Sequence, residues 1–150
     1  MSHTYIHSDF HCIFSTKHRQ RFLMEEHRRR LFPYMTATAN AKGMRLLAVG
    51  GTEDHVHLLL SLPGTIPLST GMQLIKGNTS HWLGKTFPEL KEFAWQEGFA
   101  AFGVSASNVD AVREYIEHQE EHHAKRDFDE EFIALLKKHG IEYDPKYVFG

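Results

Sequence analysis

The pattern of apolar and polar positions divides the chain into short strands and longer helices. Alternation with a period of two predicts strands at about residues 5–16, 44–49, 53–62 and 93–104. Apolar residues that recur every three to four positions predict helices at about residues 25–42, 67–86, 108–126 and 130–139. The order β-α-β-β-α-β predicts an α+β fold of the ferredoxin-like, split β-α-β type: an antiparallel sheet with helices on one face, extended by C-terminal helices.

Turn residues and prolines mark the boundaries of these elements. Gly50 and Gly51 make the connection after the second strand so short that it should form an antiparallel hairpin with the third. Pro67 suits the first turn of the second helix. Pro33 lies inside the first helix and is expected to kink it or to mark its true start. A length of 150 residues fits a single domain spanning residues 1–150.

The third strand carries two histidines on one of its faces. Side chains alternate along a strand, so His55 and His57 point one way while Val56 and Leu58 point the other. The apolar face can be buried, which leaves two imidazoles side by side, spaced to hold one divalent cation. Histidines in this pattern also occur without a metal, so the pattern alone leaves both interpretations open.

The helix at about residues 108–126 has a polar stripe beside its apolar face. At about 100° per residue, Gln119 and His122 lie within about 40° of Tyr115, next to the face made by Val112 and Ile116. Such a stripe can contribute groups to a site that opens to solvent. The plainer interpretation is a tyrosine at the edge of the core beside a solvated polar face, and the stripe by itself favours that one.

Composition restricts the compartment. The chain has a single cysteine, Cys12, so it has no disulfide framework, which is typical of a reducing compartment. It shows no apolar run long enough to span a membrane and no signal peptide. We therefore expect a cytoplasmic protein that has no membrane partner.

Charge is distributed unevenly along the chain, although the net charge is only −2. Residues 1–51 hold eight Lys/Arg and three acids, a balance of +5, whereas residues 52–150 hold nine and sixteen, a balance of −7. The basic part includes Arg28, Arg29 and Arg30. These side chains either contact phosphates or form a solvated helix face, and the twelve histidines point only weakly to metal or phosphodiester chemistry.

Taken together, the motifs resemble those of the single-tyrosine HUH transposases, the enzymes of the smallest hairpin-ended insertion sequences and of their REP-associated relatives. The likeness includes FSTKHR (14–19), DHVHLL (54–59), IKGN (75–78), WQEGF (95–99), YIEHQEEHH (115–123) and LLKKHGIEY (135–143). It spans nearly the whole chain. The histidine pair followed by Tyr-x-x-x-Gln is its most specific part, and His118, where relatives often carry Asn, is a departure outside the catalytic positions.

The resemblance implies a metal-dependent DNA transposase whose extra C-terminal helix is catalytic. His55, His57 and Gln119 would bind Mg²⁺ or Mn²⁺, and Tyr115 would attack the scissile phosphate of single-stranded DNA with hairpin ends. The products would be a 5′-phosphotyrosine and a free 3′-OH, so that the strand can be rejoined. An unperturbed tyrosine with a pKa of about 10 is a weak nucleophile, and the sequence shows no dedicated base for it.

The resemblance also implies a DNA interface and a homodimer. Candidate DNA contacts are Lys17, Arg19, Arg28, Lys76 and Trp95, although Trp95 could equally be a core residue. In the implied dimer, the tyrosine helix of one subunit serves the histidine strand of the other. The small residues at 103–107 form a connection that would allow either this arrangement or a self-contained subunit, and spacing does not distinguish the two.

Two other functions are compatible with the same pattern. A metal-dependent hydrolase that activates water would retain its activity without Tyr115. A ferredoxin-like nucleic-acid-binding protein without catalysis would be indifferent to metal, and the intact set of His55, His57, Tyr115 and Gln119 argues against it.

Overall fold

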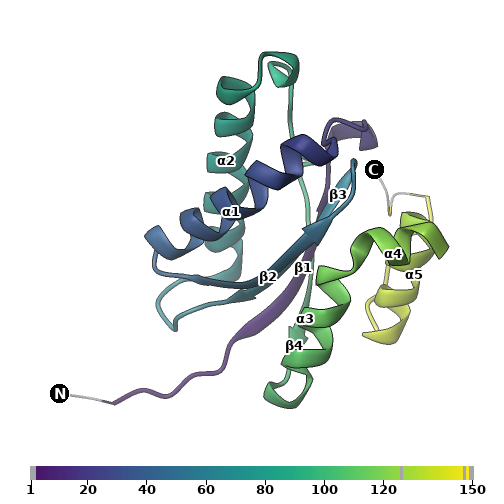
Figure 1. The fold of residues 1–150 in the computed structure, drawn as a ribbon. Coiled ribbons are helices and arrows are strands. Elements are labelled where there is room, and N and C mark those ends of the chain that lie inside the picture. Colours follow the sequence, from purple (N-terminus) through teal and green to yellow (C-terminus); the bar gives the residue numbers. More distant parts are fainter. Residues whose placement is uncertain (1–2, 126, 147, 149–150) are drawn as a thin grey trace.

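A four-stranded antiparallel sheet forms the centre of the structure, a computed structural model that describes residues 3–125, 127–146 and 148 (Figure 1). The strands are β1 (Asp9–Ser15), β2 (Arg45–Gly51), β3 (His55–Ser61) and β4 (Ala100–Val104), and they lie in the order β2-β3-β1-β4. This order, with β1 and β3 at the centre, confirms the predicted ferredoxin-like α+β fold.

The helices α1 (Glu25–Ala41) and α2 (Leu68–Thr86) cover one face of this sheet (Figure 1). Their buried side chains pack on the inward positions of β1 and β3, which include Phe14, Val56 and Leu58. Residues at alternate positions of a strand share one face, so the apolar half of β3 enters this main core. The histidine half of β3 is thereby turned to the opposite face of the sheet.

The opposite face is covered by the C-terminal helices α3 (Val109–Glu117), α4 (Gln119–Lys125) and α5 (Phe128–Lys138) (Figure 1). Ile116 of α3 packs against Ala48 and Leu59, while Phe128 of α5 packs against Ile13. The core helices thus lie on one face as predicted, and the C-terminal helices close the other. As a result, the β3 histidines are buried between the sheet and the C-terminal helices.

The helix α1 runs without interruption from Glu25 through Pro33 to Ala41, so the suggestion that Pro33 marks its start is wrong. Proline inside a helix costs about 3 kcal/mol because it removes a backbone donor and crowds the preceding turn. Burial of Leu31 and Met35, both completely inaccessible, offsets that cost on either side of the proline.

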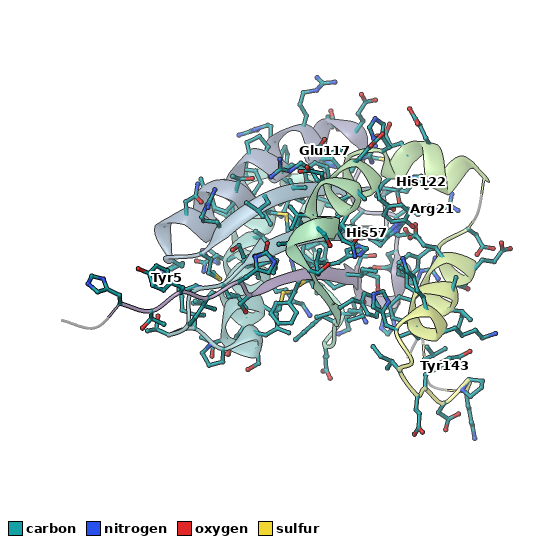
Figure 2. All side chains as sticks on the ribbon, turned by 90° about the horizontal axis from the view of Figure 1, so that it is seen from below. Tyr5, Arg21, His57, Glu117, His122 and Tyr143 are labelled. Carbon is teal, nitrogen blue, oxygen red and sulfur yellow. The ribbon has the colours of Figure 1, made fainter. Side chains whose placement is uncertain are left out.

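Two strands are shorter than predicted. The first begins at Asp9, because Tyr5 lies exposed on the extended N-terminal stretch (Figure 2). The fourth begins only at Ala100, and between residues 93 and 99 only Trp95 forms an isolated bridge, to Thr16. β1 then continues into the 3₁₀ helix η1 (Lys17–Arg19), and the Ser15 backbone N–H donates to the Gln96 side chain at 2.5 Å instead of to a strand carbonyl, so the ladder is interrupted between Trp95 and Ala100.

The predicted helix at 108–126 is two helices, α3 and α4, separated at His118; residue 126 lies outside the described residues. The imidazole Nδ1 of His118 lies 2.7 Å from the carbonyl oxygen of Glu114. In a continuous helix that carbonyl would accept from the His118 backbone N–H, which here turns to Tyr115 instead. Competition for one carbonyl therefore accompanies the break.

Short 3₁₀ helices complete the connections, namely η2 (Pro88–Leu90) and η3 (Ala106–Asn108). None of the helices in the described ranges combines the length and the apolar character that crossing a lipid bilayer requires.

Candidate active site

The strand β3 presents His55 and His57 on the face covered by the C-terminal helices. The register of the ladder places them opposite Ser15 and Ile13 of β1. Both side chains are almost completely buried, with 1% and 0% exposure. The predicted strand with both histidines on one face is thus confirmed. Both imidazoles are covered, although the sequence predicts a site that opens to solvent.

Two polar side chains orient the ring of His55 through its Nδ1 atom. Its Nδ1 lies 2.9 Å from Asp54 Oδ1 and 3.0 Å from Thr52 Oγ1. An ionised carboxylate only accepts, so Nδ1 donates, and this bond orients the ring with Nε2 towards the site. Burial alone would raise the pKa of Asp54, but the hydrogen bond from His55 and the charge of Arg19 bring it down to about 2.

The ring of His57 is oriented by a third histidine, His11 of β1. The His11 Nε2 and His57 Nδ1 atoms are 2.8 Å apart in a buried environment. Burial, together with the neighbouring His57, lowers the pKa of His11 to about 3, so His11 is neutral and can accept a hydrogen bond. The pairing of Nδ1 with His11 turns Nε2 of His57 towards the site.

Close approach of α3 to β2 delivers the helical side of the site. A Cβ atom on Gly50 would lie 1.9 Å from the carbonyl oxygen of Ile116, so only glycine allows the helix to lie this close. The break at His118 follows directly, and Gln119 starts α4 with its side chain only 2% exposed. The amide Oε1 of Gln119 lies 3.4 Å from His55 Nε2.

Tyr115 lies in the last turn of α3, half-buried at the border of the sheet. Its ring stacks on His122 with centroids 4.4 Å apart, as expected for members of one helical stripe. Figure 2 places His57 and His122 beside the same green ribbon of α3 and α4. The Tyr115 hydroxyl donates a hydrogen bond to Oε2 of Glu131.

Glu131 of α5 is the member of the site that sequence reasoning missed. It is 5% exposed, and its Oε1 lies 3.0 Å from His57 Nε2 and 3.9 Å from His55 Nε2. A signal exists in the sequence, because Glu131 interrupts the apolar face that Phe128, Phe132 and Leu135 form at helical spacing. Burial would raise the pKa of Glu131, but hydrogen bonds from His57 and Tyr115 lower it to about 2.

The donor set of this site fits a divalent cation. The potential ligand atoms of His55, His57 and Glu131 lie within 4.8 Å of one another, and the Gln119 amide oxygen joins them beside His55. His55 Nε2 lies 3.4 Å from Gln119 Oε1 and 3.9 Å from Glu131 Oε1, so nitrogen and oxygen ligand atoms are grouped on one side of the ring. Imidazole nitrogens combined with carboxylate and amide oxygens can bind exchangeable metals such as Mg²⁺ or Mn²⁺. Closed structural zinc sites are instead typically built with thiolates.

The predicted basic contacts near the site are engaged in different ways. Arg19 bridges Asp54 and Asp129, with its guanidinium over the Phe128 ring, and so ties η1 to α5. Arg28 donates to the carbonyl of Leu23 and pairs with Glu120 of α4. Lys17 is exposed at the same end of β1. Arg19 and Arg28 thus contact the C-terminal helices, and the contacts of all three side chains with DNA stay a prediction.

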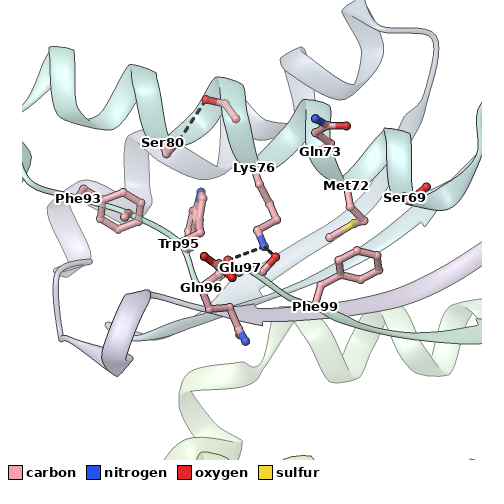
Figure 3. Close-up of a pocket in the computed structure, with 12 residues that line it drawn as sticks. Ser69, Met72, Gln73, Lys76, Ser80, Phe93, Trp95, Gln96, Glu97 and Phe99 are labelled. Carbon is pink, nitrogen blue, oxygen red and sulfur yellow. Dashed lines mark hydrogen bonds between the residues drawn. The ribbon is translucent and has the colours of Figure 1, made fainter. Parts of the chain in front are cut away.

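Lys76 and Trp95 lie at a separate pocket of about 470 Å³ between α2 and residues 93–99 (Figure 3). The Lys76 ammonium donates to the carbonyls of Gln96, Glu97 and Gly98. Trp95 is 7% exposed and packs on Phe14 in the main core, so its ring is covered in this structure. The pocket lies on the α2 side of the sheet and does not contain the histidines.

A second cavity, of about 460 Å³, opens between α3 and α5. Tyr115 and Glu131 are part of its lining, together with His11, Lys138 and His139. The hydroxyl–carboxylate pair can therefore be reached from this cleft, although the two histidines of β3 lie deeper.

A model of IS200-like transposases matches residues 4–119, well over half of the chain. The chain belongs to the IS200-like transposase family. The transposase of insertion sequence IS200 from Salmonella typhimurium is 30% identical over 125 residues, which span 79% of this chain and 81% of that protein. The ISDra2 transposase TnpA of Deinococcus radiodurans is 26% identical over 116 residues, or 74% of this chain and 83% of that one.

Solved structures agree with this assignment. A candidate transposase from Deinococcus radiodurans superposes with a TM-score of 0.65 at 26% identity, over 79% of this chain and 96% of that one. A REP-associated tyrosine transposase bound to a REP hairpin gives a TM-score of 0.56 at 19% identity, over 77% and 68%, and supports the fold alone. The family predicted from the motifs is thus confirmed.

The part of this IS200-like transposase that follows residue 119 lies outside the range matched by the family model. That part contains α5 and Glu131. His55, His57, Tyr115 and Gln119 all fall inside the matched range, whereas the carboxylate that joins them comes from beyond it.

Proposed function

We propose that this IS200-like transposase cleaves and rejoins single-stranded DNA through a covalent bond to Tyr115. The supporting observation is that α3 carries the Tyr115 hydroxyl to the same buried group of acceptors as His55 and His57 of its own chain. The ring centroids of Tyr115 and His57 are 6.1 Å apart, and Glu131 bonds to both side chains. A nucleophile beside a cation-binding set is the arrangement that phosphoryl transfer requires.

In this proposal His55, His57 and Gln119 hold Mg²⁺ or Mn²⁺. A divalent cation bound there would polarise and orient the scissile phosphate as a Lewis acid. Asp54 fixes the ring of His55 and His11 fixes that of His57, so both Nε2 atoms are aimed before any ligand arrives.

Tyr115 performs the bond exchange. Its oxygen forms a bond to phosphorus while the bond from phosphorus to the 3′ oxygen breaks, giving a 5′-phosphotyrosine and a free 3′-OH. The tyrosine loses its hydroxyl proton and the departing 3′ oxygen gains one. Reversal with a new 3′-OH restores the phosphodiester, so the same residue supports strand transfer.

The substrate we propose is single-stranded DNA with hairpin ends. A REP-associated tyrosine transposase of similar fold is bound to a REP hairpin. The cleft between α3 and α5 contains Tyr115 and places Lys138 and His139 nearby, where they can face a phosphate backbone. Lys17, Arg19 and Arg28 stay the proposed contacts for DNA at the other end of the site, and a homodimer stays a proposal from the family resemblance.

The test is a denaturing gel after incubation with labelled, hairpin-bearing single-stranded oligonucleotides from the DNA that flanks the gene. We expect a covalent adduct that EDTA abolishes and that added Mg²⁺ or Mn²⁺ restores. Cleavage without any adduct would favour a hydrolase that uses activated water. Binding without cleavage, with or without metal, would favour a non-catalytic DNA-binding protein.

A further inference from the structure

The two carboxylate oxygens of Glu131 face different partners. Oε1 points to the histidine pair, 3.0 Å from His57 Nε2 and 3.9 Å from His55 Nε2. Oε2 accepts hydrogen bonds from the Tyr115 hydroxyl and, at 3.4 Å, from the amide of Gln119. One side chain therefore joins the cation-binding atoms of β3 to the nucleophile of α3.

We infer that Glu131 is an anionic ligand of the metal ion and that its second oxygen positions the Tyr115 hydroxyl. This inference rests on the proposed function, because it places the carboxylate in the same metal site. It adds to the two histidines and Gln119 a ligand from a helix outside the range shared with the family model.

The surroundings of Glu131 favour a cation over an incidental contact. An ionised carboxylate is costly to bury unless hydrogen bonds or positive charge compensate it. Tyr115 and Gln119 supply donors to Oε2, while Oε1 lies 3.0 Å from His57 Nε2 and 3.9 Å from His55 Nε2. A cation among these atoms would be bound by Oε1 and the two imidazole nitrogens, and its charge would compensate the buried carboxylate.

The position of Glu131 is determined by the way α5 is anchored. The Asp127 side chain accepts from the backbone N–H of Glu130 and so caps the start of the helix. Phe128 packs on Ile13 of the sheet, and Arg19 pairs with Asp129. These contacts lie within one turn of Glu131, so the carboxylate is held by an ordered helix start.

A carboxylate shared in this way links metal binding to the nucleophile. The ion would fix Oε1, and the hydrogen bond from Oε2 would then fix the direction of the Tyr115 hydroxyl. Orientation of a nucleophile towards an in-line approach contributes substantially to rate. Glu131 would thus affect both the affinity for the ion and the rate of adduct formation.

The experiment measures Mn²⁺ binding to the full chain, freed of metal by chelation, by isothermal titration calorimetry without DNA. Glu131→Gln keeps the shape of the side chain and removes its charge. Its matched control is Glu130→Gln, on the same turn of α5 but exposed. Thermal unfolding of each variant establishes that α5 remains folded, and Glu131→Asp tests rescue by a shorter carboxylate.

We expect the dissociation constant for Mn²⁺ to rise at least about tenfold in Glu131→Gln, to recover in part in Glu131→Asp, and to stay within about twofold in Glu130→Gln. At saturating Mn²⁺, adduct formation by Glu131→Gln should still be slower than in the unaltered protein. Equal Mn²⁺ affinity of Glu131→Gln and the unaltered protein would overturn the inference.

A His57→Ala variant separates this failure from failure of the proposed function. If His57→Ala loses Mn²⁺ while Glu131→Gln retains it, the metal site stands and only the role of Glu131 falls. If the unaltered protein binds no Mn²⁺, the inference falls too, and the adduct assay decides on Tyr115 independently.

Discussion

His57 is held from both ends of its imidazole ring, by His11 at Nδ1 and by Glu131 at Nε2. The same logic applies to His55, which Asp54 orients from behind. Residues that orient metal-binding histidines typically affect metal affinity or activity about 10–100-fold when they are removed. We therefore expect substitutions of orienting residues such as His11, outside the family motif, to affect metal affinity or activity as well.

His11→Ala should slow adduct formation by about 10–100-fold, because His57 loses the partner that fixes its ring. The measurement is the rate of adduct formation at saturating DNA, with Mn²⁺ affinity as a second readout. His81→Ala is the control, since His81 is an exposed histidine on α2, on the other side of the sheet. An unchanged rate in His11→Ala would show that the His11–His57 contact does not orient the site.

Cys12 should be inert in the native protein. Burial raises the pKa of its thiol to about 12, so almost no thiolate exists at pH 8, and the side chain is inaccessible. Labelling with iodoacetamide at pH 8 is expected to be negligible in buffer and to reach one thiol per chain in guanidinium chloride. Rapid labelling of the native protein would show that the main core opens readily at β1.

The histidine pair could be predicted from sequence because a strand's alternation is local: Val56 and Leu58 reveal the buried face, and His55 and His57 must take the other. Tyr115 and Gln119 were found through the family resemblance. Glu131 and His11 could not be found in the same way, since their contacts join β3 to α5 and to β1. Such contacts depend on how distant elements pack.

At the scale of elements, the docking of α3 on β2 determines where Tyr115 lies. The contact is made between backbones, with Gly50 opposite the carbonyl of Ile116. A side chain added at Gly50, several residues away from either histidine, is therefore expected to displace Tyr115.

Gly50→Ala should displace α3, lower the free energy of unfolding by about 1–3 kcal/mol and strongly reduce adduct formation. The reason is that its Cβ would lie 1.9 Å from Ile116 O. Gly77→Ala in α2 is the control: nothing lies within 4 Å of its Cβ position, and alanine is favoured in a helix by about 1 kcal/mol. Urea unfolding and the adduct assay measure both effects. A Gly50→Ala protein as stable and active as the unaltered one would contradict this account of α3 docking.

Element boundaries were harder to predict than element types. The helix predicted at 108–126 breaks because the His118 side chain takes the Glu114 carbonyl, a choice that hydrophobic periodicity does not report. The predicted strand at 93–104 is regular only from Ala100, because the Gln96 side chain takes the Ser15 backbone N–H that would continue the ladder. In both places a specific polar group or a partner strand decided the local structure.

At the scale of the whole molecule, one chain brings together the predicted nucleophile and the predicted metal ligands. The connection at 103–107 leads α3 back onto its own sheet, so Tyr115 lies beside the histidines of the same chain. The family resemblance instead implied a site shared between subunits. The single chain presents the self-contained arrangement, and the choice between the two stays a matter for experiment.

Mixing two inactive variants tests this arrangement. One chain carries His55→Ala and His57→Ala, and the other carries Tyr115→Phe. If each subunit is self-contained, co-expressed and copurified heterodimers form no DNA adduct, because every site lacks a component. An adduct on the histidine-deficient chain would show that its tyrosine serves the partner's histidines, and would overturn the self-contained arrangement.

Peptide mapping identifies the residue to which DNA becomes attached. After reaction with a labelled single-stranded oligonucleotide, nuclease and trypsin digestion should leave a nucleotide on the peptide of residues 114–125, in which Tyr115 is the sole tyrosine. We expect this modification in the unaltered protein and its absence in Tyr115→Phe, which should still bind the oligonucleotide. A nucleotide on any other residue, or an undiminished adduct in Tyr115→Phe, would show that Tyr115 is not the nucleophile.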